Sequence, residues 1–209
     1  MSNAPAKIVV AAFDFDGTIT YRDTLGPFLL YLAGPFGVLV NGLLLLPVLV
    51  AYVLHLMPNS VAKERVLRRF LGGKSSAELE TVARRFVGER LTALVRPQAL
   101  ARLAWHRAQG HRCIVVSASI DDYVGPWALA AGFDDVIATQ LARDGNGRLS
   151  GGYDGANCYG FEKARRLQAL LGDGDYELYA YGDSRGDREL LALADHAFFR
   201  TMPGGEDVE

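Results

Sequence analysis

Two short segments, one near each end of the chain, each contain a pair of aspartates. Asp14 and Asp16 lie one residue apart in Phe13-Asp-Phe-Asp-Gly-Thr18, and Asp183 and Asp187 lie in Gly182-Asp-Ser-Arg-Gly-Asp187. Carboxylates that share a pocket repel each other and raise each other's pKa unless a cation lies among them. Hard oxygen ligands with room left for water and substrate suit Mg²⁺. These four residues are therefore predicted to form a magnesium site.

A serine and a lysine between those two segments have the chemistry to bind an anion. Ser117 follows the apolar run Cys113-Ile-Val-Val116, and Lys163 ends the segment Gly160-Phe-Glu-Lys163. A hydroxyl and an ammonium group suit an anionic substrate group, most naturally a phosphate. Taken alone, Lys163 could be solvated on its helix and Ser117 could simply end a strand. Together with the four acidic residues, they favour a phosphoryl-transfer site.

The elements that position these residues are predicted to alternate between strands and helices. Short apolar runs typical of buried strands lie at 8–13, 113–119, 136–141, 176–181 and 196–199. Helices are predicted at 60–72, from 75 or 76 onward, 97–110, from 121 or 122 to 132, 161–171 and 188–194, with a hairpin and loop at 148–160. This alternation indicates an α/β fold with a Rossmann-like parallel sheet sandwiched by helices. Strands of such a sheet bring the residues at their carboxyl ends to one edge.

The whole pattern resembles the haloacid dehalogenase superfamily, and in particular its phosphoserine-phosphatase-like branch, subfamily IB. Phe-Asp-Phe-Asp-Gly-Thr18 matches the first signature block and Ser117 the second. Gly-Phe-Glu-Lys163 matches the third, and Gly-Asp-Ser-Arg-Gly-Asp187 the fourth. The resemblance covers nearly the whole chain, with the blocks in the family's order. It implies a phosphoric monoester hydrolase.

The resemblance implies a role for each acidic residue. Asp14 would be the nucleophile that accepts the phosphoryl group as an aspartyl phosphate. Asp16 would protonate the leaving oxygen and then activate the hydrolytic water. Mg²⁺ would be bound by Asp14, the backbone carbonyl of Asp16 and Asp183, with Asp187 in support. Asp187 also has a simpler explanation, because an acidic residue at this place could begin the following helix and complement its dipole.

The same resemblance implies that three further residues contact the phosphate. Ser117 and Lys163 would hold the transferring phosphoryl group, and Thr18 would assist through its amide or hydroxyl. The histidines at 106, 111 and 196 have the sequence context of surface or turn residues and receive no role.

In this superfamily a helical cap is inserted between the first and second blocks. The corresponding division is a discontinuous catalytic core, 1–20 and 97–209, with a cap at 21–96. Phosphoserine phosphatases carry a glutamate seven residues after the second aspartate of block one, where this chain has Asp23. Their second block continues with glycines, where this chain has Ala118 and Ser119. Both departures weaken the case for an amino-acid substrate.

The cap contains an apolar region, 27–57, whose part from Phe36 to Met57 has no charged residue and is long enough to nominate a membrane span. Because the site residues lie on both sides of it, the chain must return to the side that it left. We therefore expect a hairpin around Asn41-Gly42 or Pro47 that enters one leaflet, or else a buried cap or a dimer interface. The basic residues that follow suit an anionic membrane surface: Lys63, Arg65, Arg68 and Arg69.

With this apolar region, the chain resembles the bacterial phosphatidylglycerophosphate phosphatases of the C type. The resemblance includes a Cys-x-Gly-x-Glu-Lys block, found here as Cys158-Tyr-Gly-Phe-Glu-Lys163. It implies a lipid phosphomonoester as substrate and a monotopic location at the cytoplasmic face of the inner membrane. A soluble phosphatase for a small metabolite is the alternative, with a phosphotransferase outcome also open. A non-catalytic membrane adaptor is more remote, because every acidic residue of the blocks is present.

Composition limits the remaining functions. A net charge of −2 argues against a nucleic-acid binder, which is normally basic. Two cysteines are too few for a disulfide framework and favour a reducing, cytoplasmic compartment. The chain is therefore expected to act on a phosphate ester, without nucleic acid as a partner.

Overall fold

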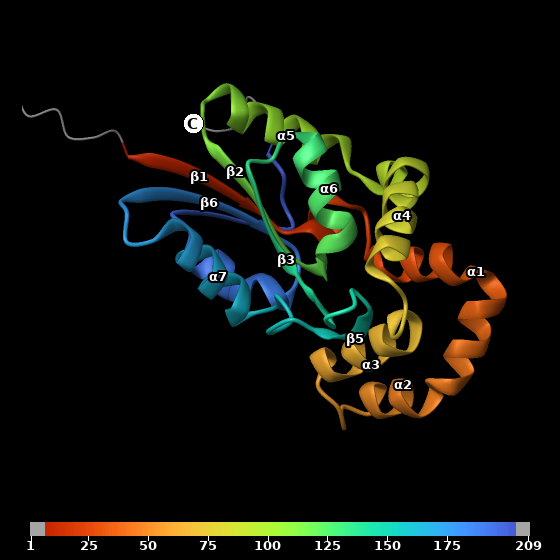
Figure 1. Cartoon of the computed structure of the whole chain (residues 1–209). Coiled ribbons are helices and arrows are strands. Elements are labelled where there is room, and N and C mark those ends of the chain that lie inside the picture. The colour runs from red at the N-terminus through yellow and green to blue at the C-terminus, as the bar shows by residue number, and fades with distance from the viewer. Residues whose placement is uncertain (1–6, 204–209) are drawn as a thin grey trace, which may run out of the picture.

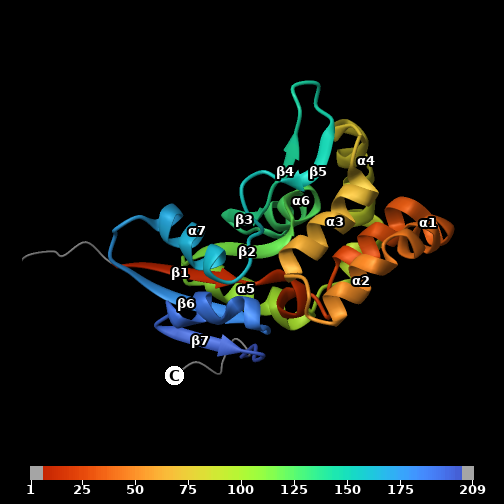
Figure 2. The same ribbon diagram turned by 90° about the horizontal axis from the view of Figure 1, so that it is seen from below.

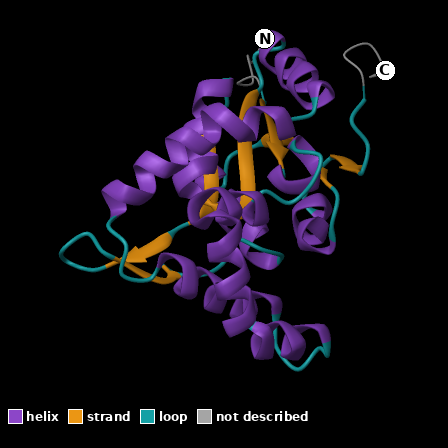
Figure 3. Ribbon diagram, turned by 90° about the vertical axis from the view of Figure 1, so that its right-hand side faces the viewer, coloured by secondary structure: helices purple, strands orange, loops and turns teal. Residues whose placement is uncertain are grey.

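The core of the molecule is a five-stranded sheet in the order β3-β2-β1-β6-β7, with every neighbouring pair parallel. The structure, a computed structural model, describes residues 7–203. The strands are β1 (Ile8–Phe13), β2 (Arg112–Ile120), β3 (Asp135–Thr139), β6 (Tyr176–Gly182) and β7 (His196–Phe199). They lie side by side at the centre of the molecule with helices on either side (Figure 3). The predicted α/β fold with a parallel sheet is confirmed.

Helices cover both faces of the sheet, which explains why β1 is apolar along its whole length and β2 from Cys113 to Val116. On one face, Phe13 packs in a cluster with residues of α5 and α6; on the other, Val10 and Ala12 pack with Leu167 and Leu190 of α7 and α8. Figure 1 shows α5 and α6 on the opposite side of the strands from α7. These helices are α5 (Pro97–Ala108), α6 (Asp121–Ala131), α7 (Phe161–Leu171) and α8 (Arg188–Ala192).

Of the helices that join β1 to β2, the first four lie beyond the ends of the strands (Figure 1). They are α1 (Leu25–Leu44), α2 (Leu46–Val53), α3 (Asn59–Leu71) and α4 (Ser76–Phe86). Ser75, one of the two serines that the sequence offers as the start of α4, begins the helix by accepting the amide of Glu78 at 3.1 Å. Buried residues of α1, α3 and α4, such as Phe28, Leu67 and Phe86, belong to the same apolar cluster as Phe13.

The apolar region 27–57 forms α1 and α2, and it differs in detail from the expectation. The chain turns at Leu45, just before Pro47, whereas Asn41 and Gly42 lie inside α1. Helix α1 is interrupted earlier, where Gly34 has a φ of +69° before Pro35. Proline is disfavoured inside a helix because it lacks an amide proton and clashes with the preceding turn. Among the described residues, α1 alone is long and apolar enough to cross a membrane.

A two-stranded antiparallel hairpin stands apart from the main sheet, next to α3 and α4 (Figure 2). It pairs β4 (Leu141–Arg143) with β5 (Leu149–Tyr153). The predicted strand 136–141 was therefore too long, because β3 ends at Thr139 and Leu141 belongs to the hairpin. The hairpin contacts the helices through Ser76, whose hydroxyl donates to the Gly147 carbonyl at 2.8 Å.

Candidate active site

Asp14 lies where β1 ends, at the edge of the sheet that faces the four joining helices. Its amide donates to the carbonyl of Tyr181 in β6 at 2.9 Å, which continues the pairing of the two strands by one residue. Buried aromatic rings hold the preceding Phe13, which stacks on Tyr181 with ring centroids 4.4 Å apart. Asp14 itself is only 5% exposed. A rigid, buried strand end therefore positions this carboxylate.

Gly17 allows the chain to turn sharply after Asp16, next to the side chain of Asp183. It has a φ of +82°, in the left-handed region that favours glycine. A Cβ at this position would lie 2.3 Å from a carboxylate oxygen of Asp183. Any other residue would therefore strain the backbone and displace Asp183 from its place beside the turn 15–19.

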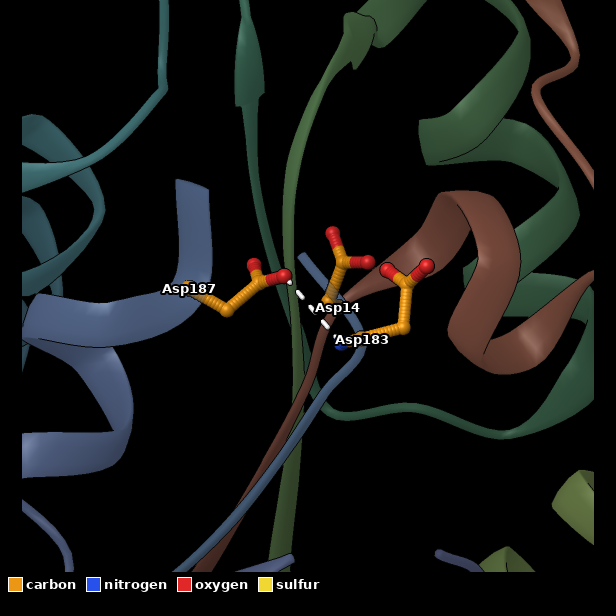
Figure 4. Close-up of side chains that lie close together, drawn as sticks. All are labelled: Asp14, Asp183 and Asp187. Atoms are coloured by element: carbon orange, nitrogen blue, oxygen red, sulfur yellow. Dashed lines mark hydrogen bonds between the residues drawn. The ribbon is translucent and has the colours of Figure 1, made fainter. Parts of the chain in front are cut away.

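Three carboxylates from separate parts of the sequence meet at this edge of the sheet. One oxygen each from Asp14, Asp183 and Asp187 lie within 4.8 Å of one another, and the side chains face a common space in Figure 4. Burial raises the pKa of Asp14 to about 7, and the nearby Asp187 contributes to this rise against the opposing effect of Lys163. Burial, with Asp187, likewise raises the pKa of Asp183. The cluster thus carries unfavourable negative charge.

These oxygens fit a small divalent cation. All are hard ligands of the kind that Mg²⁺ prefers, and one oxygen of Asp183 is buried without a hydrogen-bond partner among the described residues. A cation between Asp14 and Asp183 would favour their charged forms and reverse the rise in pKa. Asp187 fits less directly, because both of its oxygens already accept hydrogen bonds.

Lys163 lies at the centre of the cluster, in the first turn of α7. Its Nζ donates to Asp14 and, at 2.6 Å, to Oδ1 of Asp187, and its side chain is 2% exposed. Burial opposes the charge of Lys163, but the two carboxylates outweigh this effect and raise its pKa. The same pairing outweighs burial at Asp187 and lowers the pKa of that carboxyl. Lys163 is therefore a charged, fully enclosed side chain next to Asp14.

Asp187 connects the lysine to the loop that carries Asp183. Its Oδ2 accepts the Ser184 hydroxyl at 2.8 Å, the Ser184 amide at 3.0 Å and the Asp183 amide at 3.2 Å. Figure 4 marks the last of these bonds. Asp187 also directly precedes α8, so its position at a helix start and its contact with Lys163 occur together.

Asp16 lies in the turn 15–19, and its carboxylate accepts hydrogen bonds from three donors. Oδ1 accepts the amide of Thr24 at 2.7 Å and the Thr24 hydroxyl at 2.6 Å, while Oδ2 accepts the Ser119 hydroxyl at 2.5 Å. Burial and the neighbouring Asp23 raise the pKa of Asp16, and these hydrogen bonds oppose the rise. The sequence did not single out Thr24 or Ser119, although Ser119 occupies one of the places where a glycine was expected.

The other two predicted phosphate ligands lie beside the cluster. Ser117 is fully buried, and its hydroxyl accepts the Ser119 amide at 2.9 Å. The Thr18 hydroxyl is buried and has no hydrogen-bond partner among the described residues. Thr18 lines a separate hollow of about 460 Å³, whose lining also includes Asp183. Neither residue lines the main cavity.

The main cavity has a volume of about 550 Å³ and combines a charged end with an apolar wall. The charged end is formed by Asp14, Asp16, Lys163 and Asp183. The apolar wall comes from the joining helices and includes Leu25, Leu49, Tyr52 and Val66.

Lys63 of α3 also lines this cavity, and its position corrects the expectation that it faces a membrane. Its Nζ donates to the carbonyl of Ala118 at 2.5 Å and lies 3.5 Å from Oδ1 of Asn157. Burial lowers its pKa. The helical spacing could have revealed this, because Lys63 is four residues before Leu67 and seven before Phe70, both buried.

The parallel sheet, with an acidic cluster and a buried lysine at the carboxyl ends of its strands, defines an α/β enzyme. The sequence model of the haloacid dehalogenase-like hydrolases matches residues 11–192. The chain therefore belongs to the haloacid dehalogenase-like hydrolase family and is a hydrolase.

The chain is also similar to individual proteins. The chain is 40% identical to the protein CicA of Caulobacter vibrioides over 199 residues, which is 94% of this chain and 87% of CicA. A solved structure of a protein of unknown function from Bordetella pertussis has a TM-score of 0.78 and 25% identity, covering 90% of this chain and 87% of that one. A phosphoserine phosphatase from T. onnurineus shares the fold, with a TM-score of 0.62, 17% identity, and coverage of 99% and 92%.

Proposed function

We propose that this protein is a magnesium-dependent phosphatase that hydrolyses a phosphate monoester through an aspartyl phosphate on Asp14. The observation that carries the proposal is the buried Asp14 carboxylate, held by Lys163 on one oxygen and open to the main cavity beside Asp183. A carboxylate so placed is a nucleophile with an adjacent cation to stabilise the charge of the transferring group.

The reaction proceeds in two steps at phosphorus. An Asp14 oxygen forms a bond to phosphorus while the ester P–O bond breaks, and Asp16 gives a proton to the departing oxygen. In the second step Asp16 takes a proton from water as that water attacks phosphorus. The bond between phosphorus and Asp14 then breaks. This releases inorganic phosphate and regenerates the free Asp14 carboxylate.

Mg²⁺ bound by Asp14, Asp183 and the backbone carbonyl of Asp16, with Asp187 in support, would neutralise the charge of the phosphoryl group. Lys163 provides the protein's own positive charge at the same place, and Asp187 keeps that lysine oriented. Ser117 and Thr18 are proposed as contacts of the phosphoryl group only on the resemblance to the family, because neither residue lines the main cavity.

For the substrate, we propose a lipid phosphomonoester such as phosphatidylglycerophosphate, as the resemblance to the C-type phosphatases implies. The support from the structure is the shape of the main cavity, whose apolar wall of Leu49 and Tyr52 continues from the charged end. Both residues belong to α2, which has no buried residue. A phosphate at Asp14 would therefore place an attached acyl chain along α2.

We further propose that residues 21–96 form a cap and that its helices α1 and α2 lie on the cytoplasmic face of the inner membrane. Large apolar side chains are exposed along both helices: Phe36 (76%), Leu39 (59%), Leu43 (64%), Leu44 (59%), Val53 (69%) and Leu54 (61%). An exposed apolar surface of this kind marks a membrane or partner contact. Because the chain returns to the site at α3, the proposed contact is with one leaflet.

A soluble phosphatase for a small metabolite is the second candidate. Lys63 and Asp23 line the same cavity, and a pair of opposite charges there would suit a small polar substrate.

A panel of phosphate esters distinguishes the two candidates. Phosphatidylglycerophosphate and phosphatidic acid would be presented in mixed micelles, and phosphoserine and p-nitrophenyl phosphate in solution. We expect turnover that depends on Mg²⁺, is lost with EDTA, and is fastest for a lipid ester. Faster turnover of a soluble ester would refute the lipid proposal, and no hydrolysis of any ester would refute the phosphatase itself.

Two leucines of equal exposure provide a matched test of the membrane surface. Leu44 of α1 and Leu129 of α6 are each 59% exposed. Leu44→Asp should weaken sedimentation with anionic phospholipid vesicles and slow lipid turnover, while Leu129→Asp should change neither. Equal effects of the two substitutions would count against membrane contact through α1.

A further inference from the structure

Thr24, the residue before α1, uses its side chain in an unusual way. A threonine at the start of a helix usually accepts one of the free backbone amides, and losing that bond costs about 1 kcal/mol. Here the Thr24 side chain makes no such bond, and the Gly26 amide donates to Asp23 instead, at 3.2 Å. The fully buried Thr24 hydroxyl donates to Asp16. The hydroxyl is therefore directed at the active site rather than at its own helix.

The direction of the hydrogen bonds around Thr24 follows from its single hydroxyl proton. The Thr24 hydroxyl donates to Oδ1 of Asp16, and this oxygen can accept whether the carboxyl is ionised or carries its proton on Oδ2. The hydroxyl of Tyr123, 3.0 Å from the Thr24 oxygen, must then donate to Thr24. Tyr123 is fully buried against Phe28 and Phe86, and burial raises its pKa well above 10, so it keeps its proton. The result is a chain of donors from α6 through Thr24 to Asp16.

Ser119 restrains the second oxygen of Asp16 from β2. It is 1% exposed, and its hydroxyl donates to Oδ2 at 2.5 Å. Asp16 is thus bound by side chains from two separate parts of the sequence, with the Thr24 amide as a further donor at 2.7 Å. Neither χ torsion of Asp16 can change without breaking one of these bonds.

We propose that Thr24 and Ser119 are positioning residues that hold the Asp16 carboxyl for proton transfer to the leaving group, with Tyr123 orienting Thr24. The proposal rests on the phosphatase function proposed above. Proton transfer requires the carboxyl to stay within hydrogen-bond reach of the departing oxygen. Thr24 directly precedes α1, the helix that forms part of the exposed apolar surface. The start of this helix therefore holds one oxygen of the general acid Asp16.

Leaving-group dependence tests this role, because a weakly basic leaving group needs little help from a general acid. p-Nitrophenolate is such a group, whereas the alkoxide of an alkyl phosphate must be protonated as it leaves. Thr24→Val removes the hydroxyl with little change of shape. We expect it to lower kcat for the best alkyl phosphate of the panel roughly 10-fold or more, part of the 10²–10⁴ that a general acid contributes. For p-nitrophenyl phosphate we expect a change of less than about 3-fold.

Three further variants complete the test. Thr24→Ser keeps the hydroxyl and should restore kcat for the alkyl ester. Ser119→Ala should show the same leaving-group dependence as Thr24→Val, which keeps the test valid if Thr24→Val folds poorly. Thr81→Val removes an exposed hydroxyl that bonds only within α4 and should change neither rate.

The possible failures can be told apart. Three results, each seen in both Thr24→Val and Ser119→Ala, would overturn the positioning role: equal losses for the two esters, unchanged rates, or increased rates. Each of them would leave the proposed phosphatase activity intact. If the wild-type protein hydrolyses neither ester, the proposed function is overturned, and this inference with it.

Discussion

Two buried cations lie on either side of β6, and their surroundings differ. Lys163 is paired with the carboxylates of Asp14 and Asp187 next to the main cavity. Arg102 of α5 is 0% exposed and makes none of the salt bridges found among the described residues. Its Nε donates to the Tyr181 hydroxyl at 2.6 Å, and its charge lies 4.0 Å above the ring of Trp105.

Tyr181 connects the two regions. Its backbone carbonyl accepts the Asp14 amide, and its hydroxyl lies 2.8 Å from Nε2 of His106. The Tyr181 oxygen also accepts from Arg102, and Nδ1 of His106 is hydrogen-bonded to Nδ1 of His111. The guanidinium of Arg102 lies among aromatic rings, and its Nη1 and Nη2 have no hydrogen-bond partner among the described residues. The acidic cluster has charges that balance only with an added cation, and it opens to a cavity.

A buried charge alone therefore does not mark an active site. Excess charge of one sign together with access to a cavity distinguishes the Lys163 region. We therefore expect substitutions around Lys163 to change activity, and substitutions around Arg102 to change stability.

The largest effect is expected for Asp14→Asn, which removes the nucleophile but keeps its shape. Steady-state assays with the best ester should show a loss of at least roughly 10³-fold in kcat, because removing a nucleophile abolishes the covalent route. Thermal unfolding should show a stability equal to or above that of the wild type, since one of the repelling charges is gone. Metal-dependent turnover near the wild-type rate would refute the role of Asp14.

Lys163→Ala should lower kcat roughly 10²-fold or more, the effect of removing one donor that stabilises transition-state charge. Lys74→Ala is the control, because Lys74 makes only an exposed ion pair with Glu78 and should leave kcat unchanged. A loss of thermal stability without a loss of kcat would assign Lys163 to structure instead.

Tyr181→Phe should affect the other region and leave catalysis intact. It keeps the stacking on Phe13 but leaves the Arg102 and His106 nitrogens without their shared partner, which costs about 1–3 kcal/mol. Urea unfolding would measure the loss of stability, and kcat should stay within about 2-fold of the wild type. A fall in kcat comparable to that of Lys163→Ala would contradict the separation of the two regions.

The last expected effect leaves activity aside and is a dependence of stability on pH through His106. Burial, with the charge of Arg102, lowers the pKa of His106 to about 3. The unfolded chain takes up a proton at this histidine near pH 6.5 while the folded protein does not, so the free energy of unfolding falls as the pH drops below that value. The slope from this group is at most about 1.4 kcal/mol per pH unit. His106→Gln should flatten the profile between pH 6.5 and 4, and an unchanged slope would contradict the prediction.

Much of the fold was predictable because its signals are local. The run ending at Phe13 is rich in β-branched residues, which favours a buried strand, and Pro97 and Gly132 begin and end helices as predicted. The three carboxylates of Asp14, Asp183 and Asp187 followed from the rule that parallel strands place their carboxyl ends together. Boundaries were less accurate where a tertiary contact decided them, as at Leu141, which pairs with Tyr153 of the hairpin.

Other features depend on contacts that no local pattern encodes. Lys63 has the composition of a surface residue, yet its helix packs so that the ammonium group reaches Ala118. His106 was expected at the surface but is 0% exposed, because α5 lies directly on the sheet. The contacts of Thr24 and Ser119 with Asp16 join residues up to 103 positions apart.

The sequence by itself determined the strands, the acidic blocks and the lysine at their edge, because hydrophobic periodicity and residue chemistry are properties of short segments. Only the tertiary structure decided which cation faces the cavity, which histidine is buried and which hydroxyls hold Asp16. Those outcomes depend on how separate elements pack, and packing determines the burial and the hydrogen-bond partner of each polar group.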